Sequence, residues 1–202
     1  MAKKDKGKAK KQKVIKQKIK KTTKKIFFEV DAPITATKIH LLSASPEELN
    51  GKTIKLDLTK NLRGKSLELK LRIKNNDGKL TAHPELLSLA VSYIRRVMRN
   101  GADYCEDSFR AETKDHTVTI KPLMLTRKRV SREILKTLRE NAKKFLTGHL
   151  KTRSSYEIFS EIVTNKLQKD LSLKLKKTYP LALCEIRMFE LGKPLSKPPT
   201  NH

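Results

Sequence analysis

The sequence predicts an α+β fold, in which a mostly antiparallel sheet or partly closed barrel carries about three packed helices and a disordered basic N-terminal arm. Three observations lead to this prediction. Apolar and polar residues alternate in several short segments, as in half-buried strands. Elsewhere apolar residues recur every three or four positions, as in amphipathic helices. The first 25 residues contain 13 lysines and one acidic residue, Asp5.

The predicted arm covers residues 1–24. Val14, Ile15 and Ile19 are almost its only apolar residues. Burying them would not offset a backbone entropy cost of about 1–2 kcal/mol per residue. We expect the arm to remain disordered until a polyanion neutralises it. Each phosphate that a lysine neutralises releases counterions, so the arm should bind nucleic acid in a salt-dependent way without reading bases.

A single domain is predicted over residues 25–191, because 202 residues with 37% hydrophobic content can bury one sizeable core. Its first strand is expected at 26–30, where the residues form a short apolar run, and the next two at 54–58 and 67–73, where apolar residues occupy alternate positions. The cluster at 75–78 ends in Asp-Gly, a step that favours a hairpin turn. A partner strand should therefore follow at 79–81.

Three helices are predicted. The first covers 84–98, where apolar residues recur at helical spacing, and the second starts at Ser131 and ends at Gly148. The third begins at the capping-box sequence 154–157 and continues to Leu167. Residues 171–175 fit either a helix or a strand. Further strands are expected at 109–113, 118–120 and 181–191, followed by a flexible tail at 192–202.

The charge of the chain indicates a nucleic-acid partner. Lysine and arginine number 47 against 21 acidic residues, which gives a net charge of +26 and a pI of about 10.2. About +14 of this charge lies outside the first 25 residues, so the domain is basic as well. A charged surface that merely faces solvent is the alternative interpretation.

Aromatic content bears on the mode of recognition. The chain has no tryptophan and only 5% aromatic residues, which gives little sign of a platform that stacks single-stranded bases. Phe27 and Phe28 could be exposed stacking residues, but the first strand favours core positions for both. Recognition by shape and phosphate, which suits folded RNA, is therefore predicted.

The candidate contact residues are cations on ordered elements. Arg127, Lys128, Arg129 and Arg132 follow a predicted strand and enter a helix. A scaffold that fixes these side chains would let arginine forks grip a folded phosphate backbone. A solvated basic face or a localisation signal is the alternative. Helical periodicity adds a stripe on the second predicted helix, which consists of Lys136, Arg139 and Lys143. It also adds a group on the first predicted helix, which consists of Arg95, Arg96 and Arg99.

Motifs for catalysis, metals and cofactors are missing from the sequence. It has no HExxH, Walker loop, GxGxxG or GxSxG, and Glu106-Asp107 is the only adjacent acidic pair in a probable sheet segment. The sequence therefore predicts no enzyme activity, cofactor, metal or small-molecule substrate. Cys105 and Cys184 are expected to be core thiols in a reducing compartment. With no apolar span or signal peptide, a cytoplasmic protein is predicted.

Two other classes of function compete with RNA binding. A free-standing architectural DNA-binding protein would use the same charges, since counterion release operates on any duplex. A protein that binds anionic membranes would use residues 1–25, where Val14, Ile15 and Ile19 give a weak apolar face.

Five segments carry a family resemblance. Residues 24–33, KKIFFEVDAP, resemble the opening KKxWYxVxAP of the archaeal and eukaryotic small-subunit ribosomal proteins called S-three-A-e, or eS-one. Phe27 and Phe28 replace the tryptophan and tyrosine of that pattern. Four further matches keep the family's order: Gly51-Lys52, Arg95-Arg96, Lys121-Pro122-Leu123 with its basic run, and Tyr179-Pro180-Leu181 leading into Glu185-Ile186-Arg187.

The resemblance implies a structural, non-catalytic component of the small ribosomal subunit. It would bind rRNA on the platform near the mRNA exit side, beside other ribosomal proteins. The matching basic positions implied as rRNA contacts are Lys24, Lys25, Arg95, Arg96, Lys121 and the run from Arg127 to Arg132.

Overall fold

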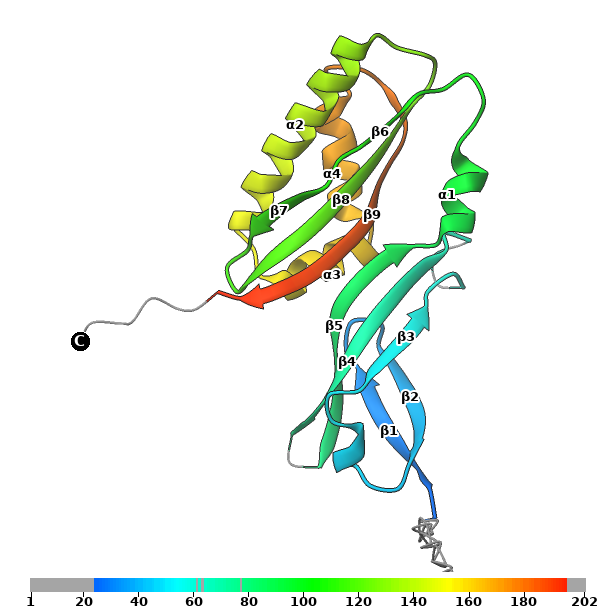
Figure 1. Cartoon of the computed structure of the whole chain (residues 1–202), viewed down its shortest axis with the longest axis vertical. Coiled ribbons are helices and arrows are strands. Elements are labelled where there is room, and N and C mark those ends of the chain that lie inside the picture. Colours follow the sequence, from blue (N-terminus) through cyan, green and yellow to red (C-terminus); the bar gives the residue numbers. More distant parts are fainter. Residues whose placement is uncertain (1–23, 61, 63, 77, 196–202) are drawn as a thin grey trace, which may run out of the picture.

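The computed structural model describes residues 24–60, 62, 64–76 and 78–195. The predicted arm lies outside these residues except for Lys24, as does the tail from residue 196 on. The described chain forms an elongated molecule in which helices cover one end of a large sheet (Figure 1). The predicted α+β class is thus confirmed, and the sheet is open, not closed into a barrel.

Nine strands and four α-helices make up the described part, with one turn of 3-10 helix, η1, at Glu47–Leu49. The strands are β1 (Ile26–Ala32), β2 (Thr37–Ser43), β3 (Thr53–Asp57), β4 (Leu67–Asn76), β5 (Lys79–Leu89), β6 (Tyr104–Glu106), β7 (Phe109–Glu112), β8 (His116–Thr126) and β9 (Leu181–Pro194). The helices are α1 (Val91–Val97), α2 (Arg132–Lys151), α3 (Ser155–Val163) and α4 (Lys166–Leu175).

Strand β5 is shared by the two halves of the sheet. One of its edges pairs with β4 along its whole length. Its other edge pairs first with β1, in parallel at Leu80 and Thr81, and then with β9, antiparallel at 86–88. The half built from β1–β4 therefore joins the half built from β6–β9 through one strand (Figure 1).

The helix predicted over 84–98 is wrong for its first half. Residues 79–89 form β5, and only Val91–Val97 are helical. Buried residues alternate along β5 up to Pro84, and a bulge then shifts the register at Glu85, so that Leu87 and Leu89 become buried. Because of this one-residue offset, the buried residues Pro84 and Leu87 are three positions apart, a spacing that resembles the period of a helix. Proline is tolerated beside the bulge, where ladder bonding is interrupted.

Strand β1 has one buried and one exposed face. Val30 and Ala32 are buried and Phe28 is half-buried, because residues two apart share a face. Phe27, for which a core position was favoured, points the other way and is 69% exposed opposite Leu42 of β2. Strand β2 was not predicted from the sequence, although it pairs with β1 in full.

Helices α2, α3 and α4 pack on the β6–β9 half of the sheet (Figure 1). Phe159 of α3 meets Phe189 of β9 edge to face, with ring centroids 4.8 Å apart. The predicted capping box is confirmed, since Ser154 and Glu157 each accept a backbone N–H of the other. The residues left undecided at 171–175 are helical, and Leu171 and Leu175 are buried.

The predicted ends of three elements need correction. Helix α2 runs through Gly148 to Lys151, because Leu150 is still buried against the core. The third predicted helix is two helices, with Asn165 between them at a positive φ of 60°. Strand β9 continues to Pro194, so residues 192–194, expected to begin the tail, belong to the sheet.

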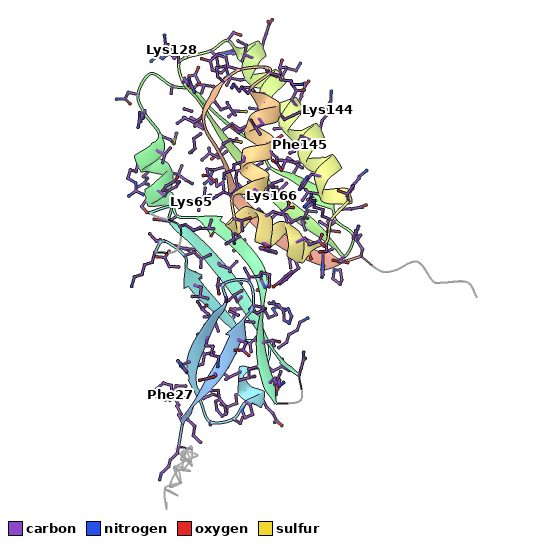
Figure 2. The ribbon with its side chains drawn as sticks, turned by 180° about the vertical axis from the view of Figure 1, so that it is seen from behind. Phe27, Lys65, Lys128, Lys144, Phe145 and Lys166 are labelled. Carbon is purple, nitrogen blue, oxygen red and sulfur yellow. The ribbon has the colours of Figure 1, made fainter. Side chains whose placement is uncertain are left out.

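A buried ion pair ties the two halves of the sheet together. Lys65, from the segment between β3 and β4, donates to the Glu185 carboxylate on β9 and to Asn165 Oδ1, the latter over 2.6 Å. The side chains of Lys65 and Glu185 are only 9% and 11% exposed. Figure 2 shows Lys65 where the lower strands meet the helical end.

Candidate nucleic-acid interface

The predicted contact residues fall into three groups. Lys24 and Lys25 are exposed before β1, at the end of the molecule far from the helices (Figure 1). Arg95 and Arg96 lie on α1, and Arg99 follows it. The largest group runs from within β8 into α2 and consists of Lys121, Arg127, Lys128, Arg129, Arg132, Lys136, Arg139 and Lys143.

Hydrogen bonds hold the loop between β8 and α2. The Thr126 hydroxyl lies 2.7 Å from the carbonyl oxygen of Lys128 and 2.8 Å from that of Asp103. The Asp103 carboxylate accepts the backbone N–H of Val130 over 2.9 Å. Arg127, Lys128 and Arg129 are nevertheless exposed. A fixed backbone therefore presents three free cationic side chains, as the sequence predicted.

Arginines from the second and third groups converge. A hollow of about 410 Å³ between the end of α1 and the ends of β8 and β9 is lined by both Arg99 and Arg127. Neither takes part in an ion pair between described residues. Each guanidinium can offer a planar fork to phosphate oxygens. The hollow therefore suits a bend of phosphate backbone gripped from two sides.

The predicted stripe on α2 is exposed as expected. Arg132, Lys136, Arg139 and Lys143 recur at helical spacing, while Leu138, Ala142, Leu146 and Leu150 on the other face are buried. The stripe borders the β6–β7 edge of the sheet, since Lys143 Nζ lies 5.8 Å from the ring centroid of Phe109. The stripe thus extends the basic surface of the loop along one side of α2.

Two predicted contacts are partly engaged within the fold. Arg96 donates to the Gly64 carbonyl over 2.9 Å and lies 5.4 Å from the ring centroid of Tyr93. This guanidinium therefore braces the segment before β4 as well as facing solvent. Lys121 is half-buried within β8, opposite Met188 of β9. It stands apart from the exposed loop that follows the strand.

Sequence reasoning missed a fourth group of cations. Lys144 of α2 lies with Lys174 and Lys177 around a hollow of about 590 Å³ between α2 and α4. Phe145 lines the same hollow. The position of Lys144 in a predicted helix could be read from the sequence, but residues 171–175 fit either a helix or a strand. Lys174 and Lys177 could not be assigned to this side of α2 without the tertiary structure.

The described residues offer little for catalysis. Ser155 Oγ and His116 Nδ1 are 3.3 Å apart, yet Ser155 is buried and no carboxylate among the described residues bonds that histidine. No group of three His, Cys, Asp or Glu side chains within the described ranges could hold a metal ion. No helix of the described chain is long and apolar enough to span a bilayer.

Both cysteines are buried free thiols, as predicted. Burial raises the pKa of Cys184 to about 12, and the neighbouring Glu185 adds to this effect. Burial also raises the pKa of Cys105, although the nearby Arg139 opposes the shift. Neither thiol is poised as a nucleophile, because the thiolate is the reactive form.

Comparison with known proteins places the basic fold in a family. The model of the ribosomal S3Ae family matches residues 10–194. A Nanoarchaeum equitans protein named small ribosomal subunit protein eS1 is 26% identical over 177 residues, which cover 83% of this chain and 89% of that protein. A protein of the same name from Methanothrix thermoacetophila is 27% identical over 156 residues, 74% of each chain. The chain therefore belongs to the ribosomal S3Ae family.

Proposed function

We propose that this chain is a structural constituent of the small ribosomal subunit and that it binds rRNA through its phosphates. Membership of the ribosomal S3Ae family is the observation that carries this proposal. The relatives named small ribosomal subunit protein eS1 support it, as does the net charge of +26. Its role is structural and requires no catalytic step.

The proposed interface has a fixed part. The loop at 127–129, braced by Thr126 and Asp103, and Arg99 in the adjoining hollow supply cations whose position the fold determines. The α2 stripe extends this surface. Such contacts select a particular backbone shape, because a bidentate guanidinium requires phosphate oxygens at a set place and angle.

A further part of the interface supplies charge without fixed geometry. The lysines of residues 1–24 would neutralise phosphates by counterion release, and Lys24 and Lys25 would begin this contact at the far end of the sheet. Binding at both ends of an elongated molecule would let it bridge separate rRNA segments.

The resemblance to the family supports a finer location. We propose that the chain sits on the platform of the small subunit near the mRNA exit side, beside neighbouring ribosomal proteins. Within the cell this corresponds to cytoplasmic ribosomes.

Sedimentation of a lysate that contains a tagged chain tests the proposal. We expect the tag in small-subunit fractions at moderate salt, and its absence there would refute a ribosomal role. Competition between small-subunit rRNA and duplex DNA provides the second arm. Preference for rRNA supports the proposal, whereas equal affinity would support an architectural DNA-binding protein.

A further inference from the structure

Two lysine-lined hollows flank helix α2. The first, between α2 and α4, is lined by Lys144, Lys174 and Lys177, and we call it the α2–α4 hollow. The second, of about 410 Å³ on the outer side of α2, is lined by Lys143, Lys144 and Lys151 together with one acidic residue, Glu140, and we call it the outer hollow. Lys144 and Gly148 line both hollows, so the two meet at this point of the helix.

The glycine at this junction is not required by the fold. Gly148 lies within α2, where glycine is less favourable than alanine by about 1 kcal/mol. A Cβ built at Gly148 would have no atom within 4 Å, so a side chain could be accommodated there. Because Gly148 has no side chain, the surface of α2 is low at this point and the two hollows connect across the helix.

The α2–α4 hollow has an aromatic wall. The rings of Phe145 and His149 are stacked with their centroids 5.8 Å apart and their planes at 25°. His149 is held in place, since its Nε2 lies 2.7 Å from Glu161 Oε2. Figure 2 shows Lys144 and Phe145 on α2, with Phe145 at the side of the helix next to α4. A flat apolar surface thus lies between cations from two helices.

We propose that a single-stranded segment of rRNA crosses α2 at Gly148 and places one unpaired base in the α2–α4 hollow against Phe145. Lys174 and Lys177 would contact the phosphates on one side of that base, and Lys143 and Lys151 those in the outer hollow. The inference rests on the proposed function, because it takes rRNA as the partner. It assigns a base-stacking contact where the overall composition had indicated recognition by phosphate and shape alone.

The lining fits a nucleotide better than an acidic peptide. A planar base stacks on an aromatic face, a contact that is tolerant of base identity. Asn141 Nδ2 donates to Thr178 Oγ1 over 3.2 Å at the same hollow, and this bond leaves the Asn141 amide oxygen and the Thr178 hydroxyl hydrogen to pair with the edge of a base. A peptide carboxylate would use the lysines but leave the aromatic wall unused.

The test measures binding of a fluorescent single-stranded RNA hexamer of uridine to the full-length protein at about 100 mM salt. Gly148→Leu places a large side chain where the two hollows meet, and Gly148→Ala is its matched control. Phe145→Leu keeps an apolar side chain but removes the ring. Lys174→Ala and Lys166→Ala remove one charge each from α4, and Lys166 lines neither hollow. Circular dichroism confirms that each variant is folded.

We expect Gly148→Leu and Phe145→Leu to weaken hexamer binding by about fivefold or more, the value of one lost stacking contact. Lys174→Ala should weaken it more than Lys166→Ala does, and Gly148→Ala should match the unaltered chain. Unchanged binding by both Gly148→Leu and Phe145→Leu would overturn the inference. Equal losses for Lys166→Ala and Lys174→Ala would also overturn it, because they would indicate unspecific charge.

A hexaglutamate probe distinguishes the two kinds of occupant. If Gly148→Leu weakens hexaglutamate binding as much as RNA binding, the hollow takes an acidic peptide and the inference is wrong. Failure of the proposed function has a different signature, which is absence of the unaltered chain from small-subunit fractions. An unaltered chain that enters the subunit, with variants that bind the hexamer normally, would refute the stacking site alone.

Discussion

Replacement of Lys65 by methionine tests the buried ion pair that joins the two halves of the sheet. Methionine keeps most of the apolar stem but removes the ammonium group, which leaves Glu185 as a buried carboxylate without its cation. Asn165 Oδ1 loses its 2.6 Å bond from Lys65 as well and keeps only the 3.4 Å bond from Gln168 Nε2. Removing one partner of a buried pair costs about 3–5 kcal/mol of unfolding free energy, mainly because the remaining charge is left uncompensated.

The exposed pair Lys38–Glu29 provides a matched control. Its side chains are 66% and 56% exposed, with the charged atoms 3.2 Å apart. Exposed pairs contribute about 0–1 kcal/mol, so Lys38→Met should barely change stability. The unfolding free energies of the two variants should therefore differ by several kcal/mol, because only the Lys65 pair is buried.

Urea unfolding followed by far-UV circular dichroism measures both variants. Urea is preferred to guanidinium chloride because it does not screen charges. A Lys65→Met variant that loses no more stability than Lys38→Met would refute the reasoning. The double variant Lys65→Met/Glu185→Leu should recover much of the loss, since an apolar pair of similar volume often replaces a buried ion pair without penalty.

Three further predictions concern single side chains. Burial raises the pKa of Cys184 to about 12, so Cys184 should react with iodoacetamide only after unfolding, and rapid labelling of the native protein would contradict its burial. Burial lowers the pKa of His83 below its ordinary 6.5, so the folded chain holds this proton less readily than the unfolded chain. The His83 contribution to stability should therefore be complete above pH 6.5 and should decline as the pH falls below it. Between pH 7.5 and 5.5, the urea concentration at the unfolding midpoint should fall less for His83→Gln than for the unaltered chain. Asp103→Ala releases the Val130 N–H and should weaken rRNA binding in a filter assay by about tenfold without changing the salt slope, whereas Arg127→Ala should also reduce the slope.

Local sequence signals predicted those elements whose contacts are local. The strict alternation over 67–73 predicted β4, and the capping-box residues predicted where α3 begins. Such signals fail where a distant strand decides the structure. Residues 84–89 have apolar positions that fit either period, and pairing with β4 across the bulge makes them a strand. Propensity and spacing cannot show this pairing in advance.

The candidate interface also has parts that the sequence could predict and parts that depend on distant contacts. The basic loop could be predicted because a strand, a cationic run and a helix start follow one another in the chain. The convergence of Arg99 with Arg127 depends on how α1 sits against β8. The burial of Lys65 depends on partners 100 and 120 residues away, and nothing in the surrounding sequence distinguishes this lysine from its exposed neighbours.

The sharing of β5 has a consequence for the folding pathway. Its edge receives β9, which lies about a hundred residues further along the chain, at only three register pairs. Closing so long a loop is slow, so each half should collapse before the other docks against it. Until β9 arrives, part of the β5 edge is an open template for pairing with other chains. The net charge of +26 keeps such chains apart by mutual repulsion, so the same lysines and arginines that attract phosphate would also protect the protein from aggregation while it folds.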